Sequence, residues 1–251
     1  MPSALELEQR VVEAWPAAES EELDGWLLRC SGGPTHRGNS VATLAAGSVL
    51  SLAERIQRAE RWYAERGRSA MIQIGPGAQP PELDRLLEQR GYLEHGDSRA
   101  AVAPTSTVLE RTTTRLQTLV ELQPSPAWLA IAEGSSRHAS TKDIFRGFLR
   151  RLGPRCRYVT AWLTPDQPAA ICLGISSPGQ LGVYAMHTVP ELRKRGAARA
   201  ALQALAAHAL ERGDPELYLL VDAQNTPARA LYAQSGFRDV YAYHYRIQGG
   251  P

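Results

Sequence analysis

Apolar residues recur along this chain at helical spacing in some stretches and form short uninterrupted runs in others. Leu52, Ile56, Ala59 and Tyr63 lie on one face of a helix, because they are spaced by four, three and four residues. Such stretches alternate with short runs like Ala70–Ile74, which are typical of buried strands. The alternation predicts a protein built from both helices and strands.

The predicted elements follow from these periods and from the glycines and prolines that interrupt them. The predicted helices span residues 5–15, 51–66, 83–90, 127–136, 142–152, 196–212 and 226–235. The predicted strands span 25–30, 40–44, 70–74, 157–164, 169–175, 180–189 and 216–222, with a short strand from Tyr92 and one strand or a strand pair over 237–247. Residues 115–120 are predicted as a strand or the start of a helix.

Two of these helices carry start signals. Ser51 and Glu54 have the spacing of a capping box, and Thr226 is predicted as an N-cap with Pro227 at the first helical position.

Two segments of the chain repeat the same order of elements. In each, a helix ends at a glycine, a strand follows, and a second helix ends at a glycine before an aromatic residue. The spacing is 24 residues from Gly67 to Gly91 and 23 from Gly213 to Gly236. Glycine after a helix is common, so chance is one explanation, and we favour the other, two copies of one βαβ-type unit.

The expected boundary between the two copies is the stretch 103–107, which is small, polar and contains a proline, as linkers often do. This places one domain at 1–103 and a second at 107–251. The copies differ where chemistry is expected. Nothing before Ser51 resembles the basic segment 193–196, and Leu87 stands where the second copy has Tyr232.

Composition narrows the classes of function. The 251 residues have a net charge of +2, which gives no strongly basic face for nucleic acid. Three widely separated cysteines argue against a disulfide framework or a zinc site and suit a reducing compartment. No apolar run approaches the ~20 residues that span a bilayer, and no signal peptide is visible. We therefore expect a cytoplasmic protein with no metal, no membrane partner and no nucleic-acid partner.

The segment 189–199 is the strongest candidate for binding chemistry. A strand ends at Pro190, a basic turn follows, and an alanine-rich helix opens at Gly196. The first N–H groups of a helix have no partner within it, and the helix dipole adds positive charge there. This arrangement suits a phosphate or pyrophosphate; the alternative is a solvated basic turn that only joins strand to helix.

A second segment follows at a fixed distance, and the pair resembles the GCN5-related N-acetyltransferase (GNAT) family. The acyl-CoA loop of that family, Arg/Gln-x-x-Gly-x-Gly/Ala, is matched by Arg193, Gly196 and Ala198. The next segment of the family is matched by Asn225, Ala228, Leu231, Tyr232, Gly236 and Phe237. The resemblance is specific over about 181–245 and looser back to about 107. The first half resembles a degenerate copy without the acyl-CoA loop, as in tandem members of the superfamily.

The resemblance implies an α/β (α+β) fold with two GNAT-like domains, each a mixed, mostly antiparallel sheet flanked by helices. In the second domain a splayed central strand pair would admit the pantetheine arm of acetyl-CoA, the implied co-substrate. Tyr232 would protonate the departing thiolate, and Asn225 would contact pantetheine or position its motif. The implied cofactor-binding residues are Thr188, Val189, Arg193, Lys194, Arg195, Gly196, Ala197, Ala198, Arg199, Asn225 and Tyr232.

The general base that deprotonates the amine is not given by the motifs. His187 is the leading candidate because it lies on the key strand, although alternation along a strand could also point it into the core. Weaker candidates are Asp222, Glu191, Tyr241, Tyr243, His244, His36 and Arg37. The tryptophans 26, 62, 128 and 162 are interpreted as core aromatics, and Trp128 could also lie near the acceptor groove.

The implied reaction moves an acetyl group from acetyl-CoA to a primary amine by direct attack in a ternary complex. A non-catalytic acyl-CoA-binding regulatory module is the main alternative. A nucleotide-binding protein is disfavoured because no Gly-x-x-x-x-Gly-Lys-[Ser/Thr] or Gly-x-Gly-x-x-Gly motif is present. Small amines, amino acids, antibiotics and peptide N-termini all remain as acceptors. We expect one cofactor per chain, in a monomeric pseudo-dimer or a homodimer, with residues 36–39 walling part of the acceptor site.

Overall fold

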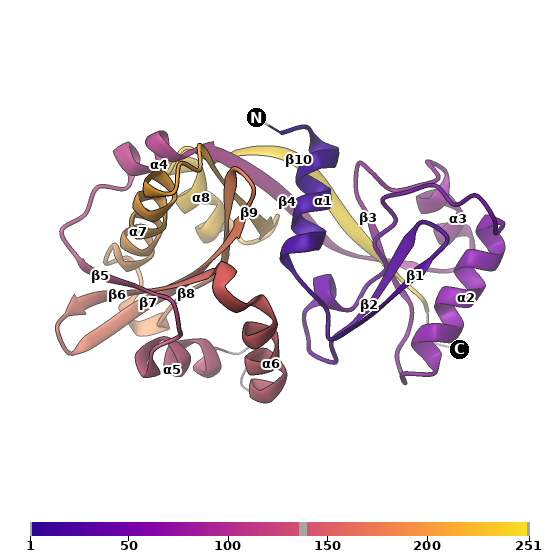
Figure 1. The fold of residues 1–251 in the computed structure, drawn as a ribbon, viewed down its shortest axis with the longest axis horizontal. Coiled ribbons are helices and arrows are strands. Elements are labelled where there is room, and N and C mark those ends of the chain that lie inside the picture. Colours follow the sequence, from indigo (N-terminus) through magenta and orange to yellow (C-terminus); the bar gives the residue numbers. More distant parts are fainter. Residues whose placement is uncertain (1, 136–139, 250–251) are drawn as a thin grey trace. The chain divides into compact units, whose positions relative to one another are not determined.

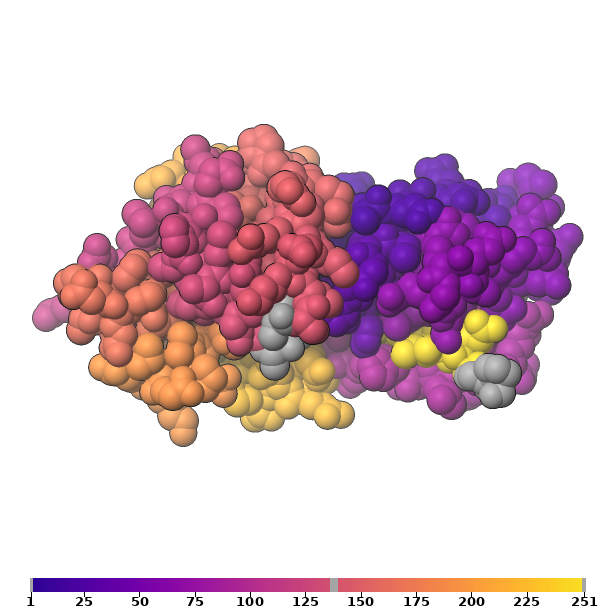
Figure 2. All heavy atoms as spheres, turned by 90° about the horizontal axis from the view of Figure 1, so that it is seen from below, coloured from indigo at the N-terminus to yellow at the C-terminus, as the bar shows by residue number. Residues whose placement is uncertain are grey.

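The computed structural model describes residues 2–135 and 140–249, which form two compact units. The C-terminal unit consists of residues 100–240. The N-terminal unit consists of residues 2–99 together with 241–249, so the end of the chain packs with its beginning. In Figure 2 this last segment, in yellow, lies among the purple residues of the same unit.

The N-terminal unit combines α-helices with short strands and a 3₁₀ turn at His36–Gly38 (Figure 1). Its elements are α1 (Ala4–Ala14), β1 (Glu19–Leu23), β2 (Trp26–Cys30), α2 (Leu52–Ala64), β3 (Met71–Ile74), α3 (Leu83–Gln89), the first part of β4 (Leu93–Pro104) and the last part of β10 (Arg238–Ile247). β1 pairs with β2 and β3 with β10, both antiparallel. Between them, isolated bridges join Ala42 to Leu27 and, in parallel, Val41 to Ile72.

The core of the N-terminal unit forms where the apolar face of α2 meets these strands. Ile56, Ala59 and Tyr63 are fully buried, as the helical spacing predicts, and they cluster with Ile72 and Leu87. The predicted capping box is confirmed, because Ser51 accepts from the Glu54 N–H while the Glu54 carboxylate accepts from the N–H of Ser51.

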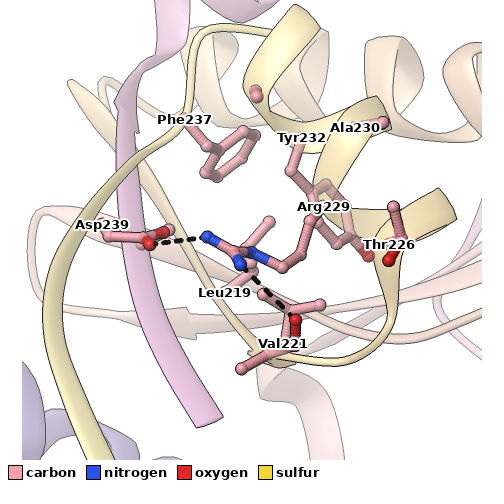
Figure 3. Close-up of a pocket in the computed structure, with 11 residues that line it drawn as sticks. Leu219, Val221, Thr226, Arg229, Ala230, Tyr232, Phe237 and Asp239 are labelled. Atoms are coloured by element: carbon pink, nitrogen blue, oxygen red, sulfur yellow. Dashed lines mark hydrogen bonds and ion pairs between the residues drawn. The ribbon is translucent and has the colours of Figure 1, made fainter.

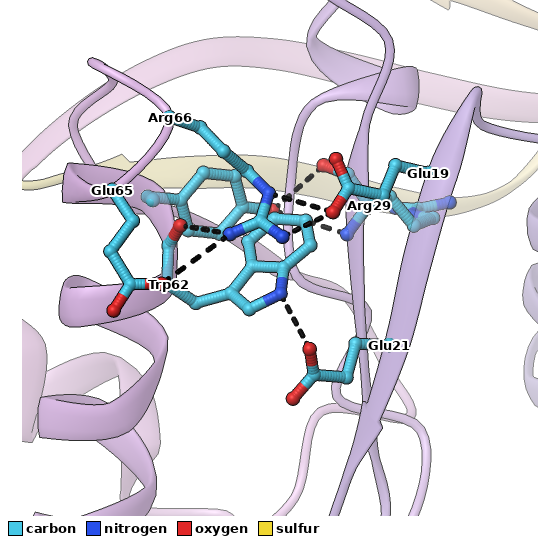
Figure 4. A network of polar contacts seen from close by, with 7 residues as sticks. Glu19, Glu21, Arg29, Trp62, Glu65 and Arg66 are labelled. Atoms are coloured by element: carbon cyan, nitrogen blue, oxygen red, sulfur yellow. Dashed lines mark hydrogen bonds and ion pairs between the residues drawn. The ribbon is translucent and has the colours of Figure 1, made fainter.

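Trp62 joins this core to a polar surface network (Figure 4). Its indole N–H donates to the Glu21 carboxylate at 2.8 Å, and the Arg66 guanidinium lies 3.6 Å from the centre of its ring. Arg66 also forms an ion pair with Glu19. The interpretation of Trp62 as a core aromatic is therefore correct, with a polar edge that the sequence pattern does not reveal.

The C-terminal unit is built around a mixed sheet in the order β9-β8-β7-β6-β5. Only the β8–β9 pair is parallel; the other neighbours in this order are antiparallel. The elements are the last part of β4, α4 (Thr105–Arg111), β5 (Gln117–Glu121), α5 (Pro126–Gly134), α6 (Lys142–Leu152), β6 (Cys156–Thr164), β7 (Gln167–Ser177), β8 (Gln180–Thr188), α7 (Ala197–Glu211), β9 (Glu216–Asp222), α8 (Thr226–Gln234) and the first part of β10.

The two faces of this sheet carry different layers. One face packs against α7, whose small residues and leucines are buried together with Leu181, Leu217 and Leu219. Trp128 of α5 is fully buried, donates its indole N–H to the Cys172 carbonyl at 3.1 Å, and packs its ring against Tyr158. Trp128 is therefore a core residue. The chain is an α+β protein with a mixed, mostly antiparallel sheet.

The repeated glycines adopt the conformation that their pattern predicts. Gly67, Gly91, Gly213 and Gly236 each follow a helix, with φ between +64° and +98°. In each unit a helix also connects two parallel segments: α2 connects Val41 to Ile72, and α7 connects β8 to β9. These features support two copies of a βαβ-type unit.

Three local predictions are wrong. The stretch 103–107 is not an irregular linker, because it ends β4 and begins α4, and buried Thr105 donates its hydroxyl proton to the Asp214 carbonyl at 2.7 Å. Residues 40–44 form only isolated bridges. The strand after Tyr92 is long rather than short, because β4 continues from one unit into the other.

Candidate active site

The centre of the candidate site is the parallel pair of strands β8 and β9. The ladder between them joins residues 180–183 to 216–219. Both strands continue beyond this ladder, β8 to Thr188 and β9 to Asp222. A strand pair that stops pairing halfway leaves backbone N–H and C=O groups available for another extended chain.

A bulge in β8 marks the point where the ladder ends. Ala185 has φ +47°, which is unusual for a residue with a side chain. On the other edge of β8 the register with β7 shifts here, because Leu173 pairs with Tyr184 while Ile171 pairs with His187. β-bulges increase local twist and bend a strand, so β8 changes direction where it leaves β9.

Beyond Val183 and Leu219, β8 and β9 no longer pair, and the space between their unpaired ends is here called the gap. The pairing of β8 with β7 decides which backbone groups of β8 face this gap. Val189 donates its N–H to the Ala169 carbonyl at 2.9 Å, so this N–H points toward β7. Thr188, opposite Ala170, therefore points its N–H and C=O away from β7 and toward the β9 side. Of the two implied cofactor-binding residues on this strand end, Thr188 has its backbone N–H facing the β9 side, whereas the Val189 N–H is already bonded to β7.

The basic loop connects β8 to the N-terminus of α7. Arg193, Lys194 and Arg195 are all exposed, and Lys194 has φ +60°. Gly196 is the N-cap of α7 with φ +86° and, lacking a side chain, does not cap the helix. The 15-residue helix α7 therefore begins with the N–H groups of Ala197, Ala198 and Arg199. These N–H groups follow the three cations in the chain, separated from them only by Gly196. This combination favours an anion.

Tyr232 of α8 lies within the core that also contains the buried face of α7. The residue is 8% exposed, and its ring packs edge-to-face on Phe237 at 5.7 Å between centroids. Burial, with a smaller contribution from Cys172, raises the pKa of the Tyr232 hydroxyl above its usual value. The hydroxyl is therefore protonated at neutral pH and can donate a proton or a hydrogen bond.

His187 faces the opposite side of the sheet from α7. Residues directly opposite in a ladder share a face, so His187 lies on the same face as Ile171. Cys172, the next residue, points to the other face, where its Sγ lies 3.5 Å from the Ala201 carbonyl of α7. His187 and Tyr232 therefore approach the β8–β9 gap from opposite faces of the sheet.

Asn225 stabilises the start of α8. It is the N-cap of α8, and its side-chain oxygen accepts the Ala228 N–H at 3.2 Å, so the predicted N-cap at Thr226 is one residue too late. Nearby, Asp222 accepts the Gln224 N–H at 2.8 Å in the loop before α8. Glu191 is exposed in a short 3₁₀ turn, and Trp162 is half-buried on β6.

The remaining candidate bases belong to the N-terminal unit. Tyr241 and Tyr243 are buried there. The His244 ring contacts Asp84 at 3.0 Å, and Asp84 also accepts from Arg246 at 2.7 Å. His36 packs against the rings of His95 and Tyr245, and Arg37 lies over the ring of Trp15. His36, Arg37 and His244 therefore each have structural partners within their own unit.

A pocket of about 330 Å³ lies beneath α8 (Figure 3). Leu219, Val221 and Phe237 supply apolar lining, and Tyr232 lines it as well. The Arg229 guanidinium reaches across to form a 3.2 Å ion pair with Asp239. Neither Arg229 nor Asp239 is predicted from the sequence, because a charged pair across a helix–strand connection has no characteristic spacing.

Comparison with known proteins adds the identity of the family. A family model described as "Probable histone acetyltransferase Rv0428c C-terminal" matches residues 4–246. The chain belongs to this family. The protein YobR of Bacillus subtilis (strain 168), described as an uncharacterized N-acetyltransferase, is 28% identical over 257 residues, covering 99% of this chain and 100% of YobR. The chain is thus an N-acetyltransferase of the GNAT class, whose members use acetyl-CoA.

Solved structures show the same fold at low sequence identity. A GCN5-related N-acetyltransferase from Kribbella flavida superposes with a TM-score of 0.69 at 14% identity, covering 100% of this chain and 97% of that one. A tandem GNAT protein from the clavulanic acid biosynthesis pathway superposes with a TM-score of 0.67 at 12% identity, covering 98% and 88%. The tandem GNAT resemblance therefore extends over the whole fold.

Within 2–135 and 140–249, no group of three or more His, Cys, Asp or Glu side chains is arranged to hold a metal ion. No helix in these same ranges has both the length and the apolar character required to span a membrane.

Proposed function

We propose that the C-terminal unit transfers an acetyl group from acetyl-CoA to a primary amine by direct attack in a ternary complex. The observation that carries this proposal is the end of the β8–β9 ladder at Val183 and Leu219, beyond which β8 continues to Thr188 and leads into the basic loop of α7. A gap beside an anion-binding helix terminus suits a ligand with a diphosphate at one end and an extended amide arm at the other.

The loop would bind the diphosphate of acetyl-CoA through the N–H groups from Gly196 to Arg199, with Arg193, Lys194 and Arg195 adding charge. The pantetheine arm would lie along β8. The Thr188 N–H, which faces this side, would orient the thioester carbonyl and donate to the oxyanion that forms on it. Asn225 would hold α8 in place by capping it.

The acid and the base would act from opposite faces of the sheet. His187 would take a proton from the ammonium form of the acceptor, and the free amine would attack the carbonyl carbon. The tetrahedral intermediate would collapse by breaking the C–S bond, and Tyr232 would protonate the thiolate. A CoA-type thiol has a pKa of about 8.5, below the value of about 10 for an ordinary tyrosine hydroxyl. Proton transfer from Tyr232 to the thiolate is therefore not strongly driven, and Tyr232 would act mainly through hydrogen bonding and geometry.

The second candidate function is a non-catalytic acyl-CoA sensor. A thiol-release assay with acetyl-CoA and a panel of small amines, amino acids and peptides separates the two. Release that depends on an amine, with the acetylated product found by mass spectrometry, supports the transferase. Acetyl-CoA binding without release from any amine class favours the sensor.

A further inference from the structure

The N-terminal unit contains a counterpart of the α7 loop. In the C-terminal unit, α7 connects the parallel strands β8 and β9. In the N-terminal unit, α2 connects Val41 to Ile72, which form a parallel bridge. Residues 44–51, here called the α2 loop, therefore occupy the same position in the topology as residues 189–196. This loop contains no lysine or arginine.

The α2 loop nevertheless surrounds an anionic group. The Asp24 carboxylate accepts the N–H groups of Ser48 at 2.9 Å and Leu50 at 2.8 Å, and both of its oxygens accept the Val49 N–H at 3.2 Å. Three successive backbone N–H groups that converge on one anion form the kind of concave site that binds phosphate in other proteins. Here the anion comes from the protein itself.

The β1–β2 hairpin carries Asp24 into the loop. Asp24 and Gly25 form its two-residue turn, with φ values of +42° and +84°. Asp-Gly with positive φ at both positions is the preferred sequence of a type I′ turn. A side chain at Gly25 would lie 3.0 Å from the carbonyl oxygens of Ala45 and Ala46, so the hairpin tip is in close contact with the loop.

A buried cation faces the same point. Arg55 of α2 is 5% exposed, and its Nε and Nη1 atoms make no hydrogen bond with any described residue. A Cβ atom on Gly47 would clash with both Asp24 Oδ2 and Arg55 Cζ, so the carboxylate and the guanidinium both face this glycine. The Arg55 guanidinium also lies 4.9 Å from the centre of the Trp26 ring. A buried guanidinium needs an anionic partner, which Asp24 supplies in part.

We infer that the α2 loop is an anion-binding site of the N-terminal unit, in which the Asp24 carboxylate occupies the place of a phosphate-type oxyanion. The N–H groups of residues 48–50 are fully used by Asp24, so the site is closed to a phosphate ligand in the native chain. The further consequence, that this half does not bind acyl-CoA, rests on the proposed function of the α7 loop. The assignment of the anion site does not depend on that proposed function.

The first experiment empties the site while keeping the turn. Asp24→Gly leaves Gly-Gly, which is also compatible with a type I′ turn. We expect inorganic phosphate, compared with chloride at equal ionic strength, to shift the amide resonances of Ser48, Val49 and Leu50 in this variant but not in the native protein. Adding Arg55→Met should abolish the shift, and Glu22→Ala, which removes an exposed carboxylate from the same hairpin, should behave as the native protein does.

The inference is overturned if phosphate leaves these three amides unchanged in Asp24→Gly, or shifts them equally in the native protein. If Asp24→Gly unfolds in chloride, phosphate must restore its folded spectrum, and failure to do so also counts against the site. These amides lie far along the chain from residues 193–199, so failure of acetyl-CoA to bind the α7 loop would leave their response intact.

The second experiment needs no variant. The N–H groups of Ser48 and Leu50 hold the pKa of Asp24 below its usual value, with smaller help from Val49 and Arg55. The amides of residues 48–50 should therefore titrate together with the Asp24 carboxyl, below its unperturbed pKa of about 3.9. Amides that do not respond when Asp24 takes up its proton would contradict the inference.

Discussion

Replacing Gly196 by alanine tests the role of the α7 N-terminus directly. Gly196 has φ +86°, and a Cβ atom there would meet only Leu116 Cδ1, at 3.8 Å, which is ordinary contact. The cost of the substitution is therefore in the backbone, about 1–2 kcal/mol for a left-handed residue with a side chain. For a protein of this size, each kcal/mol lowers Tm by roughly 2–4 °C.

Gly213 provides a matched control at the other end of the same helix. It has φ +77°, and a Cβ atom there would have nothing within 4 Å. Gly196→Ala and Gly213→Ala should therefore lower Tm by similar amounts without ligand. Acetyl-CoA at 100 times its Kd should stabilise the native protein and Gly213→Ala by about 2.7 kcal/mol.

The two variants should differ only when acetyl-CoA is present. Gly196→Ala should gain clearly less stability, because a methyl group and a displaced backbone disturb the N–H groups that would bind the diphosphate. Scanning calorimetry with and without acetyl-CoA measures both quantities. An equal acetyl-CoA response in the two variants would refute the assignment of the diphosphate to this helix terminus.

Three other predictions follow from the same site. Tyr232→Phe keeps the ring packed on Phe237 and should lower kcat by roughly 10²-fold with little change in acetyl-CoA affinity, and unchanged single-turnover rates would exclude an acid role. His187→Gln should remove the limb of the kcat/KM pH profile that reflects deprotonation of the base, and a profile with the native limb intact would exclude His187. Isothermal titration should give one acetyl-CoA per chain, whereas two per chain would contradict the closed N-terminal half.

Much of the local structure could be predicted from the sequence because its signals are short-range. The capping box at Ser51 and Glu54 and the glycines after the helices depend on residues within a few positions of one another. The helix that begins after Gly196 was predicted for the same reason. These motifs gave the family resemblance, and the family match over residues 4–246 confirms it.

The geometry of the gap depends on longer-range effects. The bulge at Ala185 shifts the register of β8, and alanine is not a residue that signals positive φ. Counting along the strand therefore could not show that Thr188 faces the gap while the Val189 N–H bonds to Ala169. The prediction of a linker at 103–107 is wrong for a similar reason. A small polar segment has the composition of a linker, and the hydrogen bond that orders it joins Thr105 to Asp214, 109 residues further along the chain.

Asp24 shows the same limit in the N-terminal unit. The Asp-Gly pair predicts a hairpin turn, yet nothing near it indicates that its carboxylate binds a loop about 25 residues further along the chain. The pairing becomes visible only after the hairpin and α2 are placed in one unit.

A crystal structure of the protein with acetyl-CoA bound tests the central claim most directly. The account predicts one cofactor per chain, with its diphosphate on the N–H groups of residues 196–199 and its thioester between β8 and β9, near the Thr188 N–H and the Tyr232 hydroxyl. A cofactor bound elsewhere, such as in the pocket beneath α8 beside Arg229 and Asp239, or with its diphosphate on the α2 loop, would contradict the account.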